Sequence, residues 1–226
     1  MKKLTTLLLA GTAMAGTNAY ANVPTLSYTV NSNIIANAKG NTAGLDFSKF
    51  NTSLGTLESV QIQLFSDFTT SISVENLSKN SASTITGTVG DVLTLTTPTL
   101  TQTLTSSGSH IFSEAKFDGV SNFAGTSGAV FTFSGAPFTS TTSYSDLATL
   151  TLFSGTGNIN TGLKGTSSSS VIGTSGNTRS LVLPSFDAYG KVTYTYALPV
   201  PEPETYAMLL TGLGLMGALL HKRKSS

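Results

Sequence analysis

Apolar and polar residues alternate with a period of two along much of the chain. Leu26, Tyr28 and Val30 are separated by polar residues, and residues 58–65 repeat the pattern, with glutamines between Val60 and Leu64. Successive side chains of a β-strand point to opposite faces, so this pattern predicts strands with one buried and one exposed face. The strand over residues 58–65 is among the clearest in the sequence.

Similar but shorter patterns predict further strands. In residues 69–77, Ile72 and Val74 face inward, and a turn follows at residues 78–81. The other expected strands are 84–88, 92–96, 100–105, 129–133, 147–153, 171–172, 181–183 and 192–198. The first two of these are expected as separate strands that are joined near Gly90-Asp91. We expect residues 31–44 to run along the surface. Residues 111–123 are expected to form a long loop with aromatic side chains, and the Gly/Ser/Thr-rich residues 158–170 a mobile surface loop.

Nine to eleven short strands, with no helix of ten residues between them, favour an all-β fold. Two packed antiparallel sheets, a β-sandwich, would bury the apolar faces of these strands. A β-solenoid is the alternative, but it requires a fixed repeat period, and the sequence has none.

The N-terminal residues have the pattern of a secretory signal peptide. Lys2 and Lys3 precede an apolar run over residues 4–16, and Ala19 and Ala21 form a signal-peptidase site. Cleavage after Ala21 leaves a body of residues 22–198 between a signal peptide (1–21) and a C-terminal tail (199–226). The Sec translocon is the expected export partner.

The tail contains an uncharged run over residues 205–220, which predicts a single transmembrane helix over residues 205–221. Sixteen helical residues rise about 24 Å, which is marginal for a hydrocarbon core of about 30 Å. Lys222, Arg223 and Lys224 follow in a basic tail (222–226) and are expected to stay cytoplasmic, with the body on the outer side of the inner membrane. The alternative is an amphipathic helix docked on the body, but residues 208–220 have no polar face.

A proline-rich motif at residues 200–204 precedes this helix. Its Pro201-Glu202-Pro203, the following apolar run Thr205–Leu215 and the basic end resemble the PEP-CTERM sorting signal of Gram-negative bacteria. The resemblance implies recognition of Pro201, Glu202 and Pro203 by exosortase. This membrane protease would remove the helix and pass the protein to the cell surface or extracellular matrix. The same tail has also been labelled an ice-binding-protein C-terminal motif.

The body resembles the choice-of-anchor E domains of secreted bacterial proteins. The resemblance rests on a Phe-x-x-Phe that begins at Phe47, the Ser-Leu-Gly-Thr-Leu that follows it, and the Thr-rich strands up to Thr97. The last strand, 191–196, directly before the tail, is similar too. This family implies a fold and no biochemical activity.

The body is weakly charged. It carries seven Lys and Arg against nine Asp and Glu, a net charge of −2. Charged residues make up 10% of the chain, against about 25% in ordinary soluble proteins. No basic patch is present to attract nucleic acid. Without cysteine, disulfides and thiolate chemistry are excluded.

Few residues of the body suggest catalysis. His110 is its only histidine and has no Gly-x-Ser-x-Gly motif beside it, so we expect a solvated residue. Asp118 and Asp187 lack the spacing of a calcium loop and are expected in turns. Glu58, Glu75 and Glu114 can form a carboxylate pair only if folding brings them together. We therefore expect a protein without enzymatic activity, metal or cofactor.

Two surface features suggest binding. Thr94, Thr96, Thr99, Thr101, Thr103 and Thr105 form near-alternating rows, which order water or ice in some proteins but are also ordinary in strands. Tyr28, Tyr144 and Tyr189 are candidates for stacking on sugars, although the chain has no tryptophan. The sequence thus predicts an exported structural or adhesive protein of a biofilm or exopolysaccharide matrix. The alternatives are a secreted carbohydrate-binding or carbohydrate-active protein and, less favoured, an ice-binding protein.

Overall fold

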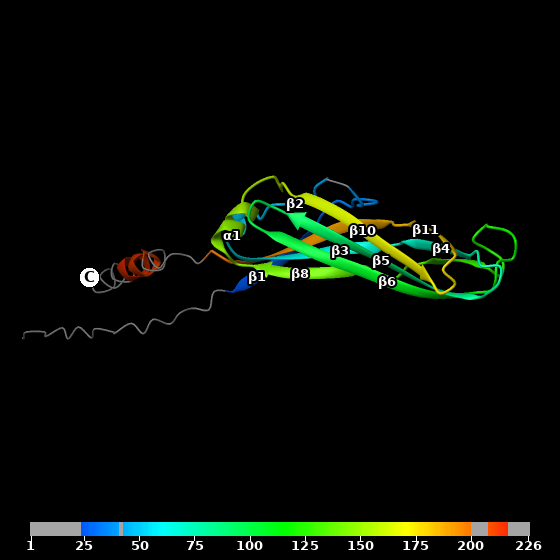
Figure 1. Cartoon of the computed structure of the whole chain (residues 1–226). Helices are drawn as coiled ribbons and strands as arrows, with labels where there is room; N and C mark the ends of the chain where they lie inside the picture. Colours follow the sequence, from blue (N-terminus) through cyan, green and yellow to red (C-terminus); the bar gives the residue numbers. More distant parts are fainter. Residues whose placement is uncertain (1–23, 41–42, 200–207, 217–226) are drawn as a thin grey trace, which may run out of the picture.

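A computed structural model describes residues 24–40, 43–199 and 208–216. These residues are mostly β and form several antiparallel sheets (Figure 1), so the all-β, antiparallel prediction is confirmed. The strands are β1 (Thr25–Asn31), β2 (Phe47–Ser48), β3 (Thr56–Phe68), β4 (Ser71–Asn76), β5 (Ser83–Thr96), β6 (Thr101–Glu114), β7 (Gly128–Thr132), β8 (Phe138–Tyr144), β9 (Asn158–Ile159), β10 (Gly162–Gly173), β11 (Thr178–Leu183) and β12 (Phe186–Ala197). A 3-10 turn η1 (Thr52–Leu54) and a helix α1 (Leu147–Phe153) complete the body.

Two of the sheets join end to end into one long layer. The first has the strand order β1-β12-β3-β8 and the second the order β11-β4-β7. Only Thr69 and Thr70 separate β3 from β4. Across this break the backbone N–H of Thr69 donates to the carbonyl of Ser185, and that of Phe133 donates to the carbonyl of Thr70, both at 2.9 Å. The antiparallel hydrogen bonding therefore continues across the break.

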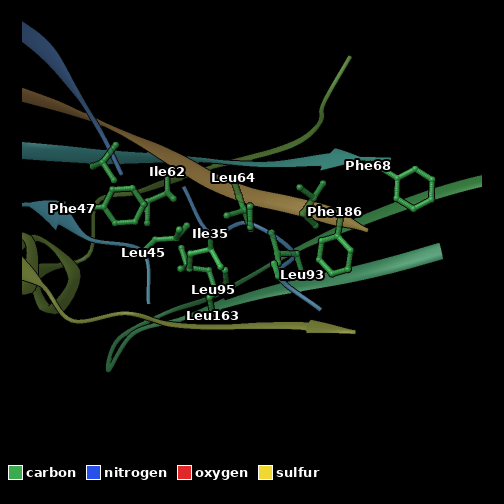
Figure 2. Packing of buried hydrophobic residues seen from close by; sticks show 14 of the residues in the cluster. Ile35, Leu45, Phe47, Ile62, Leu64, Phe68, Leu93, Leu95, Leu163 and Phe186 are labelled. Atoms are coloured by element: carbon green, nitrogen blue, oxygen red, sulfur yellow. The ribbon is translucent and has the colours of Figure 1, made fainter. Parts of the chain in front are cut away.

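The second layer is the three-stranded sheet β10-β5-β6, whose strands contain 12, 14 and 14 residues. Every second residue of β5 is buried, from Ser83 to Leu95. Figure 2 shows Leu93, Leu95 and Leu163 of this sheet facing Ile62 and Leu64 of β3. Each fully buried aliphatic side chain contributes about 1.5–3 kcal/mol, so the core between these two layers is the main source of stability.

Residues 32–40 close one side of the body. Ile35 exchanges backbone hydrogen bonds with Ala188 of β12, and the N–H of Gly40 donates to the carbonyl of Gly165 in β10. Ile35 and Ala38 are buried between these strands. The predicted surface course of residues 31–44 is therefore only partly right, because two apolar residues of this polar segment fill the gap between the layers. On the opposite side, the Gln102 amide donates to the Ser140 carbonyl, linking β6 to β8.

Residues 147–153 form the helix α1, not the predicted strand. The side chain of Asp146 caps the helix and accepts a hydrogen bond from the N–H of Thr149 at 2.9 Å. Thr149 and Phe153, four residues apart, both face the core. The mixed leucines and threonines of this segment fit both the period of a helix and that of a strand. The N-cap at Asp146 favours the helix.

Three predictions about strand length were also wrong. Residues 84–88 and 92–96 belong to one strand, β5, which continues through Gly90-Asp91. Residues 111–114 extend β6, so the predicted loop begins only after Glu114. Most of the predicted mobile loop 158–170 lies in β9 and β10, and β10 pairs with β5 along its whole length. Ser and Thr side chains tolerate a solvent-exposed strand when a long partner strand supplies the backbone hydrogen bonds.

Asn76, at the end of β4, holds two loops at the end of the body opposite α1. Its side chain is completely buried. The amide nitrogen donates to the carbonyls of Ser81 and Ala115, and the amide oxygen accepts from the Ser78 N–H and the Ser175 hydroxyl, at 2.7–3.1 Å. All four contacts of this amide are satisfied.

The neighbouring Glu75 holds the loop over residues 115–127 in the same way. This buried carboxylate accepts hydrogen bonds from the backbone N–H groups of Asn122 and Phe123 and from the Ser127 hydroxyl. We call Glu75 and Asn76 the loop anchor. It fixes the loops that connect the two layers at this end.

We expect Asn76→Ala to lower the free energy of unfolding by about 3 kcal/mol, because several buried partners lose their hydrogen bonds at once. Urea unfolding followed by circular dichroism measures this change. Asn80→Ala is the matched control, since Asn80 is exposed in the adjacent turn. A loss below about 1 kcal/mol for Asn76→Ala would contradict the role of the loop anchor.

Candidate functional site

The predicted processing residues lie outside the described part of the chain. They are Ala19 and Ala21 of the signal-peptidase site, Pro201, Glu202 and Pro203 of the sorting motif, and Lys222, Arg223 and Lys224 of the basic end. Of the predicted transmembrane helix 205–221, residues 208–216 are described, and they are helical and exposed. Among the described residues, no helix reaches the length and apolarity that a membrane crossing needs.

The two ends of the body lie next to each other. β1 pairs with β12 from Thr25 opposite Ala197 to Asn31 opposite Lys191. Beyond these pairs the N–H of Leu198 donates to the carbonyl of Pro24. The predicted signal peptide and the predicted sorting tail therefore join the body at the same end. The loop anchor lies at the opposite end (Figure 1).

Two of the three candidate carboxylates come close together. Burial raises the pKa of Glu114, and the charge of Glu75 raises it further. The oxygens of Glu75 are already used by the loop over residues 115–127. Glu58 is exposed on β3 and does not join them. Both carboxylate oxygens of Glu75 therefore hold the loop over residues 115–127 in place.

The other candidate residues make structural contacts. The imidazole of His110 stacks on Phe131, with ring centroids 3.7 Å apart, and meets the edge of Phe112 at 4.6 Å. Asp118 accepts from the N–H of Val120 in a turn, and Asp187 accepts from the N–H of Asn37. Within the described ranges, no three His, Cys, Asp or Glu residues are placed to hold a metal ion.

The predicted tyrosines and threonines fall into different environments. Tyr28 packs against Phe50 and Tyr194 beside the core, Tyr144 is half-buried in β8, and Tyr189 stacks on Phe65 at 4.7 Å. Thr99 lies in the turn between β5 and β6. The other five predicted threonines all point outward from the three-stranded sheet, where they belong to a larger array.

This array, which we call the hydroxyl face, covers the outer side of β10-β5-β6. Its outward positions carry one charged side chain among the described residues of these strands, that of Lys164. Its hydroxyl residues are Thr84, Thr86, Thr88, Thr94 and Thr96 of β5, Thr101, Thr103, Thr105, Ser107, Ser109 and Ser113 of β6, and Thr166, Ser168 and Ser170 of β10.

The hydroxyl face has an open depression over Gly90. Thr88, Val92 and Ser107 stand around this residue, and the depression has a volume of about 420 Å³. On β10 and β5, several hydroxyls donate to carbonyls of the adjacent strand, as Ser168 does to Gly90 at 3.3 Å. No partner is found in the described structure for the outward hydroxyls of β6. This row is therefore available for hydrogen bonds to a ligand.

A buried polar row lies on the inner side of the same strands. Ser106, Asp91 and Ser167 are direct neighbours on β6, β5 and β10. Asp91 is 2% exposed, and its Oδ2 has no hydrogen-bond partner; nor do the hydroxyls of the two serines. Burial raises the pKa of Asp91. Ser167 and the charge of Lys39 oppose this increase, although no hydrogen bond of good geometry joins Asp91 to Ser167.

Comparison with known proteins identifies the tail. The model of the PEP-CTERM protein-sorting motif matches residues 199–224. The chain thus carries this sorting motif at its C-terminus, which implies an exported, cell-surface-associated protein that is processed by exosortase. The match does not extend to the body, and the resemblance of residues 47–97 to choice-of-anchor E stays a prediction.

No curated protein matches the chain. Structures of infectious bursal disease virus strains Gt and Gx are each 12% identical to it over 76% and 83% of its length, with TM-scores of 0.18 and 0.16. The chain spans 33% and 48% of those viral chains.

We expect Asp91→Asn to raise the melting temperature at pH 7 by a few degrees. The pKa of Asp91 is raised in the folded state, so the folded protein binds this proton more tightly than the unfolded chain. Asp91 therefore stabilises the folded state at low pH. This stabilisation is lost as the pH rises from the pKa of Asp91 in the unfolded chain through its higher pKa in the folded protein. The amide has no charge to bury, and the advantage of the variant should disappear below about pH 4.

Thermal unfolding between pH 3.5 and 8 measures this difference. Asp46→Asn is the control, because Asp46 is an exposed aspartate outside this buried polar row. If Asp91→Asn is less stable than the parent at pH 7, burial of the ionised Asp91 carboxylate does not destabilise the folded protein.

Proposed function

We propose that this chain is an exported surface or matrix protein that is held briefly in the inner membrane by its tail. The observation that supports this is the sorting-motif match at residues 199–224. Residues 205–221 serve as the temporary membrane helix, with Lys222, Arg223 and Lys224 on the cytoplasmic side. Exosortase cuts near Pro201–Pro203 and releases the body to the cell surface or matrix.

The body, in this proposal, is a β-sandwich that acts as a non-enzymatic structural or adhesive component of an exopolysaccharide matrix. Two features support this role. The hydroxyl face offers many neutral hydrogen-bonding groups on one side of the molecule. The carboxylates considered for catalysis are exposed, as Glu58 is, or occupied by loops, as Glu75 is.

A neutral polysaccharide is a suitable partner for such a surface. Its hydroxyl groups both donate and accept hydrogen bonds, as Ser and Thr do. The body has little charge to attract nucleic acid or an ionic polymer. Ice binding has less support, because three antiparallel strands without a sequence repeat twist relative to one another and do not present a flat lattice.

We expect Glu202→Gln to leave the tail on the protein in the natural host. Removing the charge between Pro201 and Pro203 changes the motif that exosortase recognises, while the body is unaffected. Intact-mass spectrometry of the protein from the membrane and medium distinguishes the two forms. In the parent strain we expect a product that lacks Lys222–Lys224, and in a strain without exosortase we expect the full tail.

Glu58→Gln provides the control for this measurement, because it removes an exposed carboxylate from the body and should be processed normally. A parent-strain product that retains Lys222–Lys224 would remove the support for the sorting role. Secretion of the body into medium without any association with exopolysaccharide would instead contradict the matrix role alone.

A further inference from the structure

A second depression, lined by aromatic rings, lies at the side of the body between β7 and β8. It has a volume of about 390 Å³. We call it the phenylalanine pocket. Its wall includes Phe68 from the end of β3 and Ser107 from β6, and its remaining residues lie within residues 131–138. Figure 2 shows Phe68 at one end of the labelled core cluster, so the pocket begins where the core reaches the surface.

The rings of the phenylalanine pocket hold one another in place. Phe68 lies 5.8 Å from Phe133 and 6.1 Å from Phe138, with an interplanar angle of 89° in the second pair. Phe131 meets Phe133 edge to face at 4.9 Å. His110 stacks behind Phe131 at 3.7 Å. These contacts fix the ring planes before any ligand arrives, which lowers the entropic cost of binding.

The backbone of β6 also supports one ring. A side-chain carbon at Gly108 would lie 2.5 Å from the Phe133 ring. Only glycine allows this ring to rest directly on the strand. Phe133 is therefore seated against the layer rather than free to turn into solvent.

The polar groups of the pocket are neutral. No charged residue lines it. In the described structure the hydroxyls of Ser107 and Ser134 have no hydrogen-bond partner, while the Thr132 hydroxyl donates to Ser71 on the other face of the strand. Phe138 is 37% exposed. The surface thus combines aromatic ring faces with hydroxyls around an open volume of the size that small ligands occupy.

We propose that the phenylalanine pocket binds one sugar residue of a neutral polysaccharide. The carbon-bound hydrogens on the face of a pyranose ring are attracted to the negative face of an aromatic ring. Ser107, Thr132 and Ser134 line the same pocket and supply neutral polar groups for the sugar hydroxyls. A charged sugar would meet no counter-ion here, which selects for a neutral one. The assignment rests on the proposed matrix role, which supplies the polysaccharide.

The position of Ser107 extends the inference to a longer chain. Ser107 lines the phenylalanine pocket and also the depression over Gly90 on the hydroxyl face. The two depressions therefore share a wall on β6. A polysaccharide with one residue in the pocket can continue across β6 onto the hydroxyl face, where the outward hydroxyls of this strand are free.

The test is a titration of the detergent-solubilised full chain, labelled with ¹⁵N, with cellohexaose, maltohexaose and cyclohexanol. We expect backbone amide shifts at residues 131–138 and Ser107 with one of the two sugars. The expected dissociation constant is on the order of 1 mM, as for a single sugar residue on two aromatic rings. Phe138→Ala should weaken binding about tenfold by removing one wall.

Two further variants keep the test independent of folding. Ser134→Phe fills the opening of the pocket without removing a core residue and should abolish the sugar-dependent shifts. Phe65→Ala removes a ring that stacks on Tyr189 elsewhere on the long layer and should leave binding unchanged. Unaltered spectra of the remaining amides show that each variant is folded.

Shifts at Phe65 and Tyr189, or no shift at 20 mM of either sugar, would overturn the proposal. Binding of cyclohexanol in the pocket without either sugar would also overturn it and identify an apolar ligand. These results do not depend on the tail. Normal exosortase processing with no sugar binding refutes the pocket alone, and failed processing leaves the titration unaffected.

Discussion

The position of the last strand determines the arrangement of the body. β12 lies between β1 and β3 and pairs with β3 from Phe186 to Ala197. Its inner residues Val192 and Tyr194 are completely buried, and the Tyr194 hydroxyl donates to the Ser48 carbonyl at 2.7 Å. The long layer lacks its central strand until the end of the body is synthesised. Folding of the body is therefore completed only when the residues directly before the sorting tail are in place.

This constraint explains how the two ends of the chain relate to the surfaces of the body. Because β1 pairs with β12, the N-terminal and C-terminal ends of the body leave it together. The loop anchor closes the far end with buried hydrogen bonds from Glu75 and Asn76. In the proposed intermediate that is held by its tail, the lateral surfaces of both layers therefore stay free. The hydroxyl face and the phenylalanine pocket lie on those surfaces.

The sequence predicts the strands best where one face is apolar and the other polar. The alternation in residues 58–65 and the inward Ile72 and Val74 are found as predicted in β3 and β4. Local composition is a weaker guide. Residues 162–170 contain so many Gly, Ser and Thr residues that they resemble a loop, but pairing with β5 makes them a strand. In α1, a single capping aspartate outweighs a pattern that also fits a strand.

The candidate sites also differ in how well the sequence alone predicts them. The sorting motif is contiguous, so the order of its residues is enough to recognise it. The phenylalanine pocket draws on β3, β6, β7, β8 and the connection between β7 and β8, and its rings are separated by up to 70 positions in the chain. One local signal was present, since three phenylalanines flank Gly135-Ala136-Pro137 in residues 131–138. However, an apolar run that ends at Gly135-Ala136-Pro137 is also typical of an ordinary strand end. Only the folded arrangement shows that these rings meet Phe68 and remain partly open to solvent.

Ser107 lies where the phenylalanine pocket meets the depression on the hydroxyl face. It is an exposed, outward residue of β6, and its neighbours Ser106 and Gly108 are on the inner side of the strand. Its neighbour Ser106 points inward to Asp91, whose Oδ2 has no hydrogen-bond partner, while Ser107 itself lines both depressions. The layer thus carries polar residues on both sides at this point. Stability comes from the leucines further along β5, so this part of β6 is free to carry hydroxyls for a ligand instead of side chains for the core.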